Sequence, residues 1–364
     1  MADVIDITGL PHERVVVAVS PLAELGSALH VLSEPGHHAH LHGWVTATTS
    51  ALRCDLADRL HEADFLWRSA RCDLLLPAHP GATLAEELDA LDRLDDEHFV
   101  TAAFEITCRA SYERCTPSPL VDAAQRRRVR ELAAARGPRQ AAFVDRMLLD
   151  PDGLRAWLRR LFEDCEQAFF ADTWNRTRGQ LAADARHKTE LLRRKGLGAA
   201  LTAASAALGL DDSGDRILVD KLAVGRASAY ADPDDPGVTL IPTTLGRPHL
   251  LFAHGPGRRP VLQYPVDSGE LTSPVSLREV QRRLDALAHP LRMRLCRTLA
   301  RGPHTTGELV EAYGVTAPEV SRHLAVLKKA GLLTTRRRGR YVLYQLELGA
   351  VSRLGGDFIE GVLR

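Results

Sequence analysis

The chain has 364 residues, 45% of them apolar, with 47 basic and 47 acidic side chains and no net charge. This length favours two or more domains, and the apolar content excludes a largely disordered chain. No stretch of about 18 or more uncharged apolar residues is present and the N-terminus lacks the pattern of a secretion signal, so we expect a cytoplasmic protein without a membrane span.

The absence of net charge conceals an uneven distribution of charge along the chain. Residues 275–364 carry 16 basic and 8 acidic side chains, a net charge of +8, so residues 1–274 carry a net charge of −8. A neutral protein with one basic end is expected to hold a polyanion at that end.

A strand followed by a helix is predicted near the beginning of the chain. Residues 14–19, RVVVAV, are mostly β-branched, which favours a strand. Ser20 then stands where a helix N-cap is expected, and Pro21 occupies the first helical position, where its missing N–H is not needed.

The sequence from residue 41 to about residue 210 is mostly helical in pattern. Apolar residues at three- and four-residue steps from Leu154 predict a long amphipathic helix, with a break near Asp172 as the alternative to a continuous one. Basic residues precede Gly196, the pattern of a helix C-terminus. The predicted helical part of the N-terminal domain therefore extends to about residue 210.

Short strand-like runs separated by turns occupy residues 215–266 and predict a small antiparallel sheet. The polar segment 267–276 has the composition of a linker. We therefore predict a helix-rich α+β domain at residues 1–270, expected to bind an effector or to oligomerise, and a second domain at residues 275–364. The expected fold class is mainly α with a small antiparallel β portion.

Four short helices are predicted at the start of the second domain. Ser276 caps the first helix, whose apolar stripe is expected at Val280, Leu284, Leu287 and Ala288. The second begins at Pro290, with Leu291, Leu295, Cys296 and Leu299 facing inward. Thr305 with Glu308, and Thr316 with Glu319, have the spacing of capping boxes for the third and fourth helices, which are followed by Gly314 and Gly331.

The third and fourth helices are joined by only three residues, the layout of a helix-turn-helix. Val320, Leu324 and Leu327 repeat at i, i+4 and i+7 in the fourth helix, residues 317–330, and should be buried. The residues around its start and at its far end are then free to contact DNA bases and phosphates in the major groove. These candidate residues are Thr316, Ala317, Glu319, Ser321, Arg322, His323, Lys328 and Lys329.

A basic hairpin is predicted directly after this helix. Residues 332–346, LLTTRRRGRYVLYQL, indicate two strands with a turn at Arg338–Gly339. Four arginines lie at or beside the tip of this wing, where they can follow the phosphate backbone or enter the minor groove. They are Arg336, Arg337, Arg338 and Arg340.

Residues 275–346 resemble the ArsR (arsenic-repressor) type of winged helix-turn-helix transcriptional regulators. The resemblance rests on the His-Pro-Leu-Arg helix start, on VSRHLAVLKKAGLL and on the GR-Y-x-x-Y wing, in that order. It implies a homodimer that binds an imperfect palindromic operator in double-stranded DNA and represses transcription until an effector, such as a small molecule, releases it. The layout of the first 270 residues is similar to that of an uncharacterised domain that precedes such modules in some regulators.

Two departures limit what the resemblance implies. Metal-sensing members have cysteines in the third helix or His and Asp in the last helix, but here TTGELVEAYG has no cysteine and GAVSRLGGDFIEGVLR has no histidine. Those metal sites are therefore absent. Glu319 stands where the family more often has a small hydroxyl residue, and a carboxylate there accepts from cytosine N4 but repels phosphate, so it should narrow sequence choice.

Two other functions are weighed for the N-terminal domain. His37, His38, His40 and His42 do not have the spacing of known structural zinc sites, so we predict a loop there, with no metal and no cofactor. A metal or redox sensor that uses these histidines or the six cysteines is the first alternative. No phosphate-binding, dinucleotide-binding, serine-elbow or HExxH motif is present, so we predict no enzyme; an enzyme with a DNA-binding tail is the second alternative.

Overall fold

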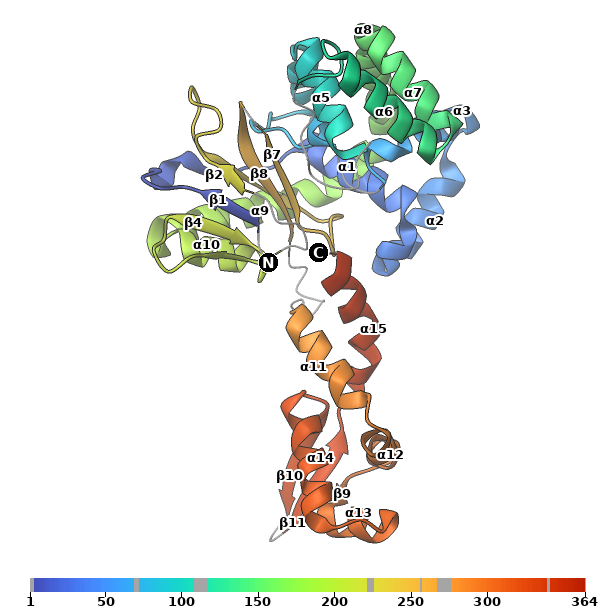
Figure 1. The fold of residues 1–364 in the computed structure, drawn as a ribbon, viewed down its shortest axis with the longest axis vertical. Coiled ribbons are helices and arrows are strands. Elements are labelled where there is room, and N and C mark those ends of the chain that lie inside the picture. The colour runs from blue at the N-terminus through green and yellow to red at the C-terminus, as the bar shows by residue number, and fades with distance from the viewer. Residues whose placement is uncertain are drawn as a thin grey trace. The chain divides into compact units, whose positions relative to one another are not determined.

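The computed structural model describes residues 3–68, 72–107, 117–220, 226–255, 257–266, 276–338 and 341–363. The chain divides into two compact units, Met1–Leu271 and Thr272–Leu363, and Figure 1 shows their helices and strands. The predicted linker 267–276 lies outside the described residues except for Ser276.

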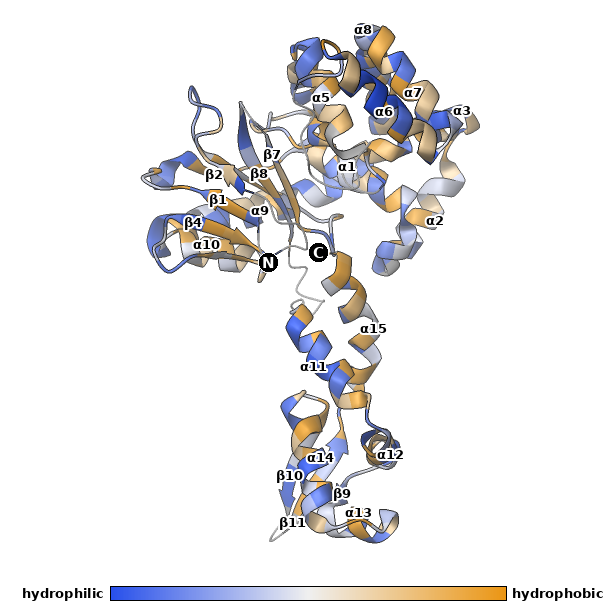
Figure 2. Cartoon of the chain, in the orientation of Figure 1, coloured by the Kyte–Doolittle hydropathy of each residue, from blue (hydrophilic) through white to orange (hydrophobic). Residues whose placement is uncertain are grey.

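Most of the N-terminal unit is helical. Its helices are α1 (Pro21–Ser33), α2 (His42–Ala51), α3 (Cys54–Ala63), α4 (Leu84–Asp92), α5 (Asp96–Thr107), α6 (Ala123–Arg136), α7 (Pro138–Leu149), α8 (Pro151–Cys165), α9 (Ala171–Lys195) and α10 (Leu197–Ala204). The apolar faces of α1 to α8 enclose one large core, in which Trp67, Phe99 and Phe104 are fully buried, whereas α10 packs with the strands in a second core. α6, with its run of arginines, is the most hydrophilic of these helices (Figure 2).

The long helix predicted from Leu154 is confirmed, with a local change in its winding. α8 continues into α9 through a π-helical turn, Glu166–Phe170, which lies just before the predicted alternative break at Asp172. α9 ends at Gly196, whose φ of 82° favours glycine. The aromatic residues at the π turn pack into the helical core, Phe170 fully and Phe169 in part.

Two four-stranded sheets complete the N-terminal unit. The strands are β1 (Asp3–Asp6), β2 (Val15–Val17), β3 (Leu208–Leu210), β4 (Arg216–Val219), β5 (Arg226–Ser228), β6 (Val238–Thr243), β7 (Leu251–Gly255) and β8 (Arg258–Pro265). One sheet has the order β3-β4-β1-β5 and the other has the order β2-β6-β8-β7. The strand predicted at residues 14–19 is confirmed as β2, whereas β1 was not predicted.

The expectation that residues 215–266 form one antiparallel sheet among themselves is wrong in detail. The strands are divided between both sheets, and each sheet contains parallel pairs: β1 with β5, β2 with β6, and β6 with β8. Two of these pairs form because β1 and β2, from the beginning of the chain, pair with later strands, and the third forms because β7 lies at the sheet edge beyond β8, which makes β6 and β8 neighbours. A parallel neighbour needs a long crossover connection, which local strand patterns do not reveal.

α1 is the central helix of the N-terminal unit. Ser20 caps it by accepting a hydrogen bond from the Ala23 N–H at 3.0 Å, as predicted, and Pro21 begins it. Almost all of its side chains are buried, including the polar Glu24, Ser27 and His30. Since buried polar groups need partners, α1 is tied to the neighbouring sheet: Ser27 accepts a hydrogen bond from Gln263 of β8.

The C-terminal unit has the winged-helix arrangement. Its elements are α11 (Leu277–Leu287), α12 (Pro290–Leu299), β9 (His304–Thr305), α13 (Thr306–Tyr313), α14 (Ala317–Lys329), β10 (Leu333–Arg338), β11 (Tyr341–Leu346) and α15 (Leu348–Leu363). The three strands form a sheet of order β10-β11-β9. The core joins Leu295 and Leu299 of α12 to Leu309 of α13 and to α14. The predicted fold class, mainly α with a small β portion and a winged helix-turn-helix at the C-terminus, is confirmed.

The predicted apolar stripe of α11 is partly wrong. Val280 is buried, but so are Arg283 and Ala286, while Leu284 is 41% exposed. The cause is a buried ion pair between the Arg283 guanidinium and the Asp357 carboxylate of α15, 2.8 Å apart, which turns the Arg283 face of α11 toward α15. An isolated apolar pattern favours the face with Leu284, because it gives no sign of a buried partner for an arginine.

No helix in the described ranges combines the length and the apolar character needed to cross a membrane.

Candidate nucleic-acid interface

The fourth helix of the C-terminal unit, α14, is held by its buried stripe. Val320, Leu324 and Leu327 are at most 1% exposed and pack into the core, as predicted. Gly314 ends α13 with a φ of 62°, a left-handed conformation that favours glycine at a helix C-terminus. The capping box predicted at Thr305 and Glu308 for α13 is present. The tight turn and the buried stripe together fix which face of α14 points outward.

The capping box predicted for α14 is wrong. Thr316 stands at the N-cap, but its side chain makes no capping hydrogen bond. The Glu319 N–H instead donates to the Thr316 carbonyl oxygen at 3.1 Å, so it is not available to the Thr316 hydroxyl. Pro318 in the first turn fixes the backbone there without needing a cap. The Thr316 hydroxyl lies exposed at the start of the helix.

The predicted contact residues of α14 lie on its outer face. Ala317, Ser321 and Arg322 are exposed, Glu319 is half-buried, and the Arg322 Nε–H reaches back to the Pro318 carbonyl oxygen at 3.4 Å. Lys328 and Lys329 are exposed in the last turn. The structure therefore brings a hydroxyl, a guanidinium and a carboxylate together on the first turns of one helix, with two ammonium groups at its other end.

His323 differs from the other candidates because its ring is packed against a second histidine. The centroids of the His323 and His289 rings are 4.6 Å apart, and His323 is half-buried. Burial lowers the pKa of His323 below 6.5, and the neighbouring His289 and Arg292 lower it further. The contact between the two rings joins the start of α12 to α14 and leaves the His323 side chain only partly exposed. Sequence reasoning placed His289 at a helix start but did not find this contact.

The wing is formed by β10 and β11, which pair antiparallel from Leu333↔Leu346 to Arg338↔Tyr341. Arg336 and Arg337 are exposed on β10. Because successive residues of a strand point to opposite faces, these two guanidinium groups serve opposite faces of the hairpin. Gly339 and Arg340 lie outside the described residues, as does the side chain of Arg338.

The positive charges of this surface are not neutralised within the C-terminal unit. Among ion pairs between described residues, none contains Arg322, Lys328, Lys329, Arg336 or Arg337, whereas Arg283 in the same unit is paired twice. A guanidinium or ammonium group without an internal counter-ion is available to a phosphate. We call Thr316–Arg322, Lys328–Lys329 and Arg336–Arg337 the basic face of the C-terminal unit.

The histidine-rich stretch of the N-terminal unit is divided by the fold. His40 and His42 are exposed, whereas His38 is buried and His37 is half-buried. The expected loop is two short 3-10 turns, Pro35–His37 and Ala39–Leu41, which lead into α2. His38 lies close to two histidines that the sequence analysis did not consider, His30 and His249.

The described cysteines do not support a redox sensor. Cys72, Cys165 and Cys296 are buried, and burial raises the pKa of Cys72 to about 12. Thiols that stay protonated react slowly with oxidants. Cys54 is exposed but has no thiol partner among the described residues, and Cys108 and Cys115 lie outside them.

Comparison with known proteins finds a matching family model for each of the two units. Residues 1–270, well over half of the chain, match a family described as a family of unknown function, DUF5937. This chain belongs to the DUF5937 family. In this DUF5937 protein, residues 287–336 also match a helix-turn-helix domain, from α11 to the wing.

Relatives of this DUF5937 protein are named repressors. It is 38% identical to a biofilm growth-associated repressor of Agrobacterium fabrum over 26% of this chain and 82% of that protein. It is 42% identical to the HTH-type transcriptional repressor SmtB of Mycobacterium tuberculosis over 21% of this chain and 62% of that protein. The C-terminal unit therefore belongs to the ArsR/SmtB family of winged helix-turn-helix transcriptional regulators.

A solved structure is also similar to this DUF5937 protein. It is the homodimeric winged helix-turn-helix DNA-binding domain of a Mycobacterium bovis protein, 31% identical, covering 22% of this chain and 74% of that chain with a TM-score of 0.21.

Proposed function

We propose that this protein is a homodimeric transcriptional repressor that binds an imperfect palindromic operator through α14 and the wing, and that its N-terminal unit, residues 1–270, receives the effector. The observation that carries the proposal is the basic face: exposed polar and cationic side chains on the first turns of α14 and on β10, with no counter-ion among the described residues. The named repressors among its relatives support the same function.

The basic face divides into side chains that select a sequence and side chains that hold the backbone. Arg322 and Ser321, on the second turn of α14, are placed to reach base edges, and a guanidinium recognises guanine O6 and N7. Glu319 accepts from cytosine N4. The edge of His323 lies beside them. Lys328, Lys329, Arg336 and Arg337 neutralise phosphates on both sides of the groove, with Arg338 and Arg340 extending the wing's contribution.

Exposed apolar side chains on α11 and α15 support the homodimer. Leu277 and Leu284 of α11 and Phe358, Ile359 and Val362 of α15 are each at least 40% exposed. Figure 2 shows the hydrophobic stretches of α15. Large exposed apolar groups on two helices that pack together mark an interaction surface, and a second copy of the chain would bury them. Two recognition helices would then face half-sites about 34 Å, or a multiple of it, apart.

A pocket in the N-terminal unit has the size and lining for a small-molecule effector. It has a volume of about 480 Å³, and its lining includes the apolar residues Leu74, Leu91 and Ala102 and the polar residues Glu87, His98 and Arg258. Such pockets fit drug-sized ligands. The hydrophobic dye anilinonaphthalene sulfonate should bind there at one site, and Ala102→Trp should abolish binding; unchanged binding would place the effector elsewhere.

To test DNA binding, genomic DNA fragments are first selected with the full-length protein. The affinity of the protein for these fragments is then compared with its affinity for random DNA by titration. Arg322→Ala should lose the preference for selected fragments over random DNA. Arg178→Ala, which removes an arginine that is also exposed from α9 of the N-terminal unit, is the matched control and should keep this preference. If Arg322→Ala retains the full preference, α14 does not read the operator.

The homodimer is tested separately by sedimentation. Ile359→Glu places a charge on the exposed apolar surface of α15, so it should convert the dimer into monomers and weaken operator binding. A wild-type protein that sediments as a monomer at micromolar concentration would contradict this part of the proposal.

A further inference from the structure

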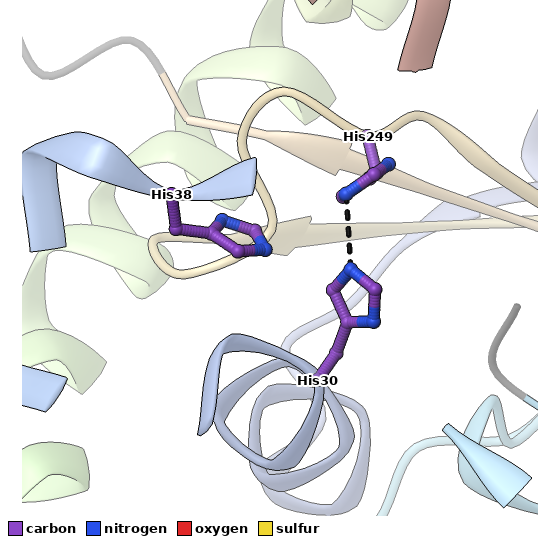
Figure 3. A group of neighbouring side chains, drawn as sticks. All are labelled: His30, His38 and His249. Carbon is purple, nitrogen blue, oxygen red and sulfur yellow. Dashed lines mark hydrogen bonds between the residues drawn. The ribbon is translucent and has the colours of Figure 1, made fainter. Parts of the chain in front are cut away.

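Four histidines from distant parts of the chain meet inside the N-terminal unit. His30 lies in the last turn of α1, His37 and His38 follow in the 3-10 turn Pro35–His37 and just after it, and His249 lies between β6 and β7. One ring nitrogen from each of His30, His38 and His249 lies within 4.8 Å of the other two. Figure 3 shows these three imidazoles facing a common space, with His38 on one side and His30 and His249 opposite each other.

Hydrogen bonds to backbone carbonyl groups fix the orientation of two of these rings. The Nδ1 atom of His30 is 2.7 Å from the Trp67 carbonyl oxygen, and the Nδ1 atom of His38 is 2.6 Å from the Arg247 carbonyl oxygen. A carbonyl oxygen only accepts, so both Nδ1 atoms carry the proton and the Nε2 atoms of the neutral rings carry a lone pair. Histidines that bind metals are held in this way, with the remote nitrogen donating to a carbonyl group.

The separation of the ring nitrogens fits ligands of one small ion. The Nε2 atoms of His30 and His249 are 3.0 Å apart and share a hydrogen bond, so the Nε2 proton of His249 must leave when an ion binds. Two nitrogens that each lie about 2.0–2.1 Å from a tetrahedral Zn²⁺ are roughly 3.3 Å apart, close to this value. The third nitrogen, from His38, lies within 4.8 Å of both.

His37 stands beside the three converging rings. Its ring centroid is 5.6 Å from that of His30 and 5.4 Å from that of His249. The His37 Nδ1 atom is buried and has no hydrogen-bond partner among the described residues. A buried polar atom without a partner costs free energy, and a bound ion would supply the missing interaction.

The donor set narrows the class of ion. It consists of imidazole nitrogens alone, with no carboxylate or thiolate in the group. Mg²⁺ and Ca²⁺ require oxygen ligands, whereas neutral imidazole suits Zn²⁺, Cu²⁺, Ni²⁺ and Co²⁺.

We propose that His30, His38 and His249, with His37 as a fourth ligand, hold one divalent first-row transition-metal ion in the N-terminal unit. The ion would link the end of α1 and the following 3-10 turn to the loop between β6 and β7. This inference does not depend on DNA binding, and its test uses no DNA.

The test begins with the full-length protein, stripped by a chelator and titrated with Co²⁺ and then Zn²⁺. One ion should bind per chain, and Co²⁺ should give the intense visible absorption of a tetrahedral site, which Zn²⁺ removes. His249→Ala should weaken Zn²⁺ binding at least about 100-fold, because loss of a ligand exceeds the 10–100-fold cost of losing an outer-shell partner. His42→Ala, in the same histidine-rich stretch but exposed, is the matched control and should bind normally.

A second measurement does not require a variant to fold. X-ray absorption of the Zn²⁺-loaded wild-type protein should show three or four imidazole ligands. The proposal is overturned if the wild-type protein binds no ion stoichiometrically, if the absorption shows fewer than three imidazoles, or if folded His249→Ala binds Zn²⁺ as tightly as wild type.

Discussion

The two units differ in how their chemically important residues are distributed. In the C-terminal unit the candidate DNA contacts lie between residues 316 and 340 in sequence, on one helix and the hairpin after it, and most of those that are described are exposed. In the N-terminal unit His30 and His249 are 219 positions apart in sequence, and they meet only because α1 packs beside the β6 sheet. A surface that binds a large polyanion can be built from one continuous segment, whereas a small ion is enclosed by groups that tertiary structure assembles.

The largest expected effect comes from breaking the buried ion pair of the C-terminal unit. Asp357→Ala leaves Arg283 buried without its partner on α15 and should lower the free energy of unfolding of that unit by about 3 kcal/mol. Hydrogen exchange in α11 and α15 measures this. Tryptophan fluorescence follows the unfolding of the N-terminal unit, because Trp44, Trp67, Trp157 and Trp174 all lie there. The stability of the N-terminal unit measured in this way should not change.

Asp285→Ala removes an exposed carboxylate from α11 and is the control for this change. Equal effects of the two variants would show that the Arg283–Asp357 pair does not hold α11 to α15.

Arg322→Ala should have the next largest effect, a loss of about 1–3 kcal/mol in binding to the selected operator, with specificity relaxed at one base position. Fluorescence anisotropy with operator and random duplexes measures both changes. Stability should stay the same because Arg322 is exposed and unpaired with any described acidic group. A uniform loss on both duplexes would instead make Arg322 a phosphate contact.

Changing Arg336 and Arg337 together to alanine should give a smaller effect of a different kind. Operator and random DNA should be bound more weakly to a similar extent, and the slope of log affinity against log salt should fall by roughly one per lost phosphate contact. Affinity measured at several salt concentrations gives the slope. An unchanged slope would exclude the wing from backbone contact.

The last two predictions concern pH, and the effects should have opposite signs in the two units. Burial raises the pKa of Glu87 to about 7, although hydrogen bonds from the Leu22 N–H and the Ser20 hydroxyl oppose this. The folded N-terminal unit therefore binds this proton more tightly than the unfolded chain and gains stability as the pH falls from above 7 toward 4.5. Urea unfolding followed by tryptophan fluorescence tests the sign.

The C-terminal unit should behave in the other way. The pKa of His323 is lowered from 6.5, so the unfolded chain binds that proton more tightly, and stability is lost as the pH falls through 6.5 toward the folded value. Hydrogen exchange in α12 and α14 should show this loss, and His323→Gln should reduce it. A loss of equal size in His323→Gln would assign it to other groups.

The sequence predicted most of the C-terminal unit because its signals are local. Periodic apolar residues at Val320, Leu324 and Leu327, the turn at Gly314 and the capping box at Thr305 each depend on neighbours a few positions away, and all are present. The exposed positions of α14 followed from the same periodicity. The predictions that were wrong, the stripe of α11 and the cap at Thr316, depended on contacts that compete with the local pattern.

In the N-terminal unit the sequence predicted helices but not the pairing of strands. β1 was not recognised, and β6 gave no sign that its neighbours would be β2 and β8 in parallel. The histidines were weighed as a local group from His37 to His42, yet two of these are exposed and the cluster includes His30 and His249. Local spacing does not reveal ligands contributed by three separate segments.

Selection of genomic fragments with the purified full-length protein, followed by sequencing, shows whether this protein recognises DNA through α14. We predict enrichment of a small set of fragments that share an imperfect palindrome, and loss of that enrichment with Arg322→Ala but not with Arg178→Ala. Fragments recovered in proportion to their abundance, or the same enrichment with Arg322→Ala, would contradict it.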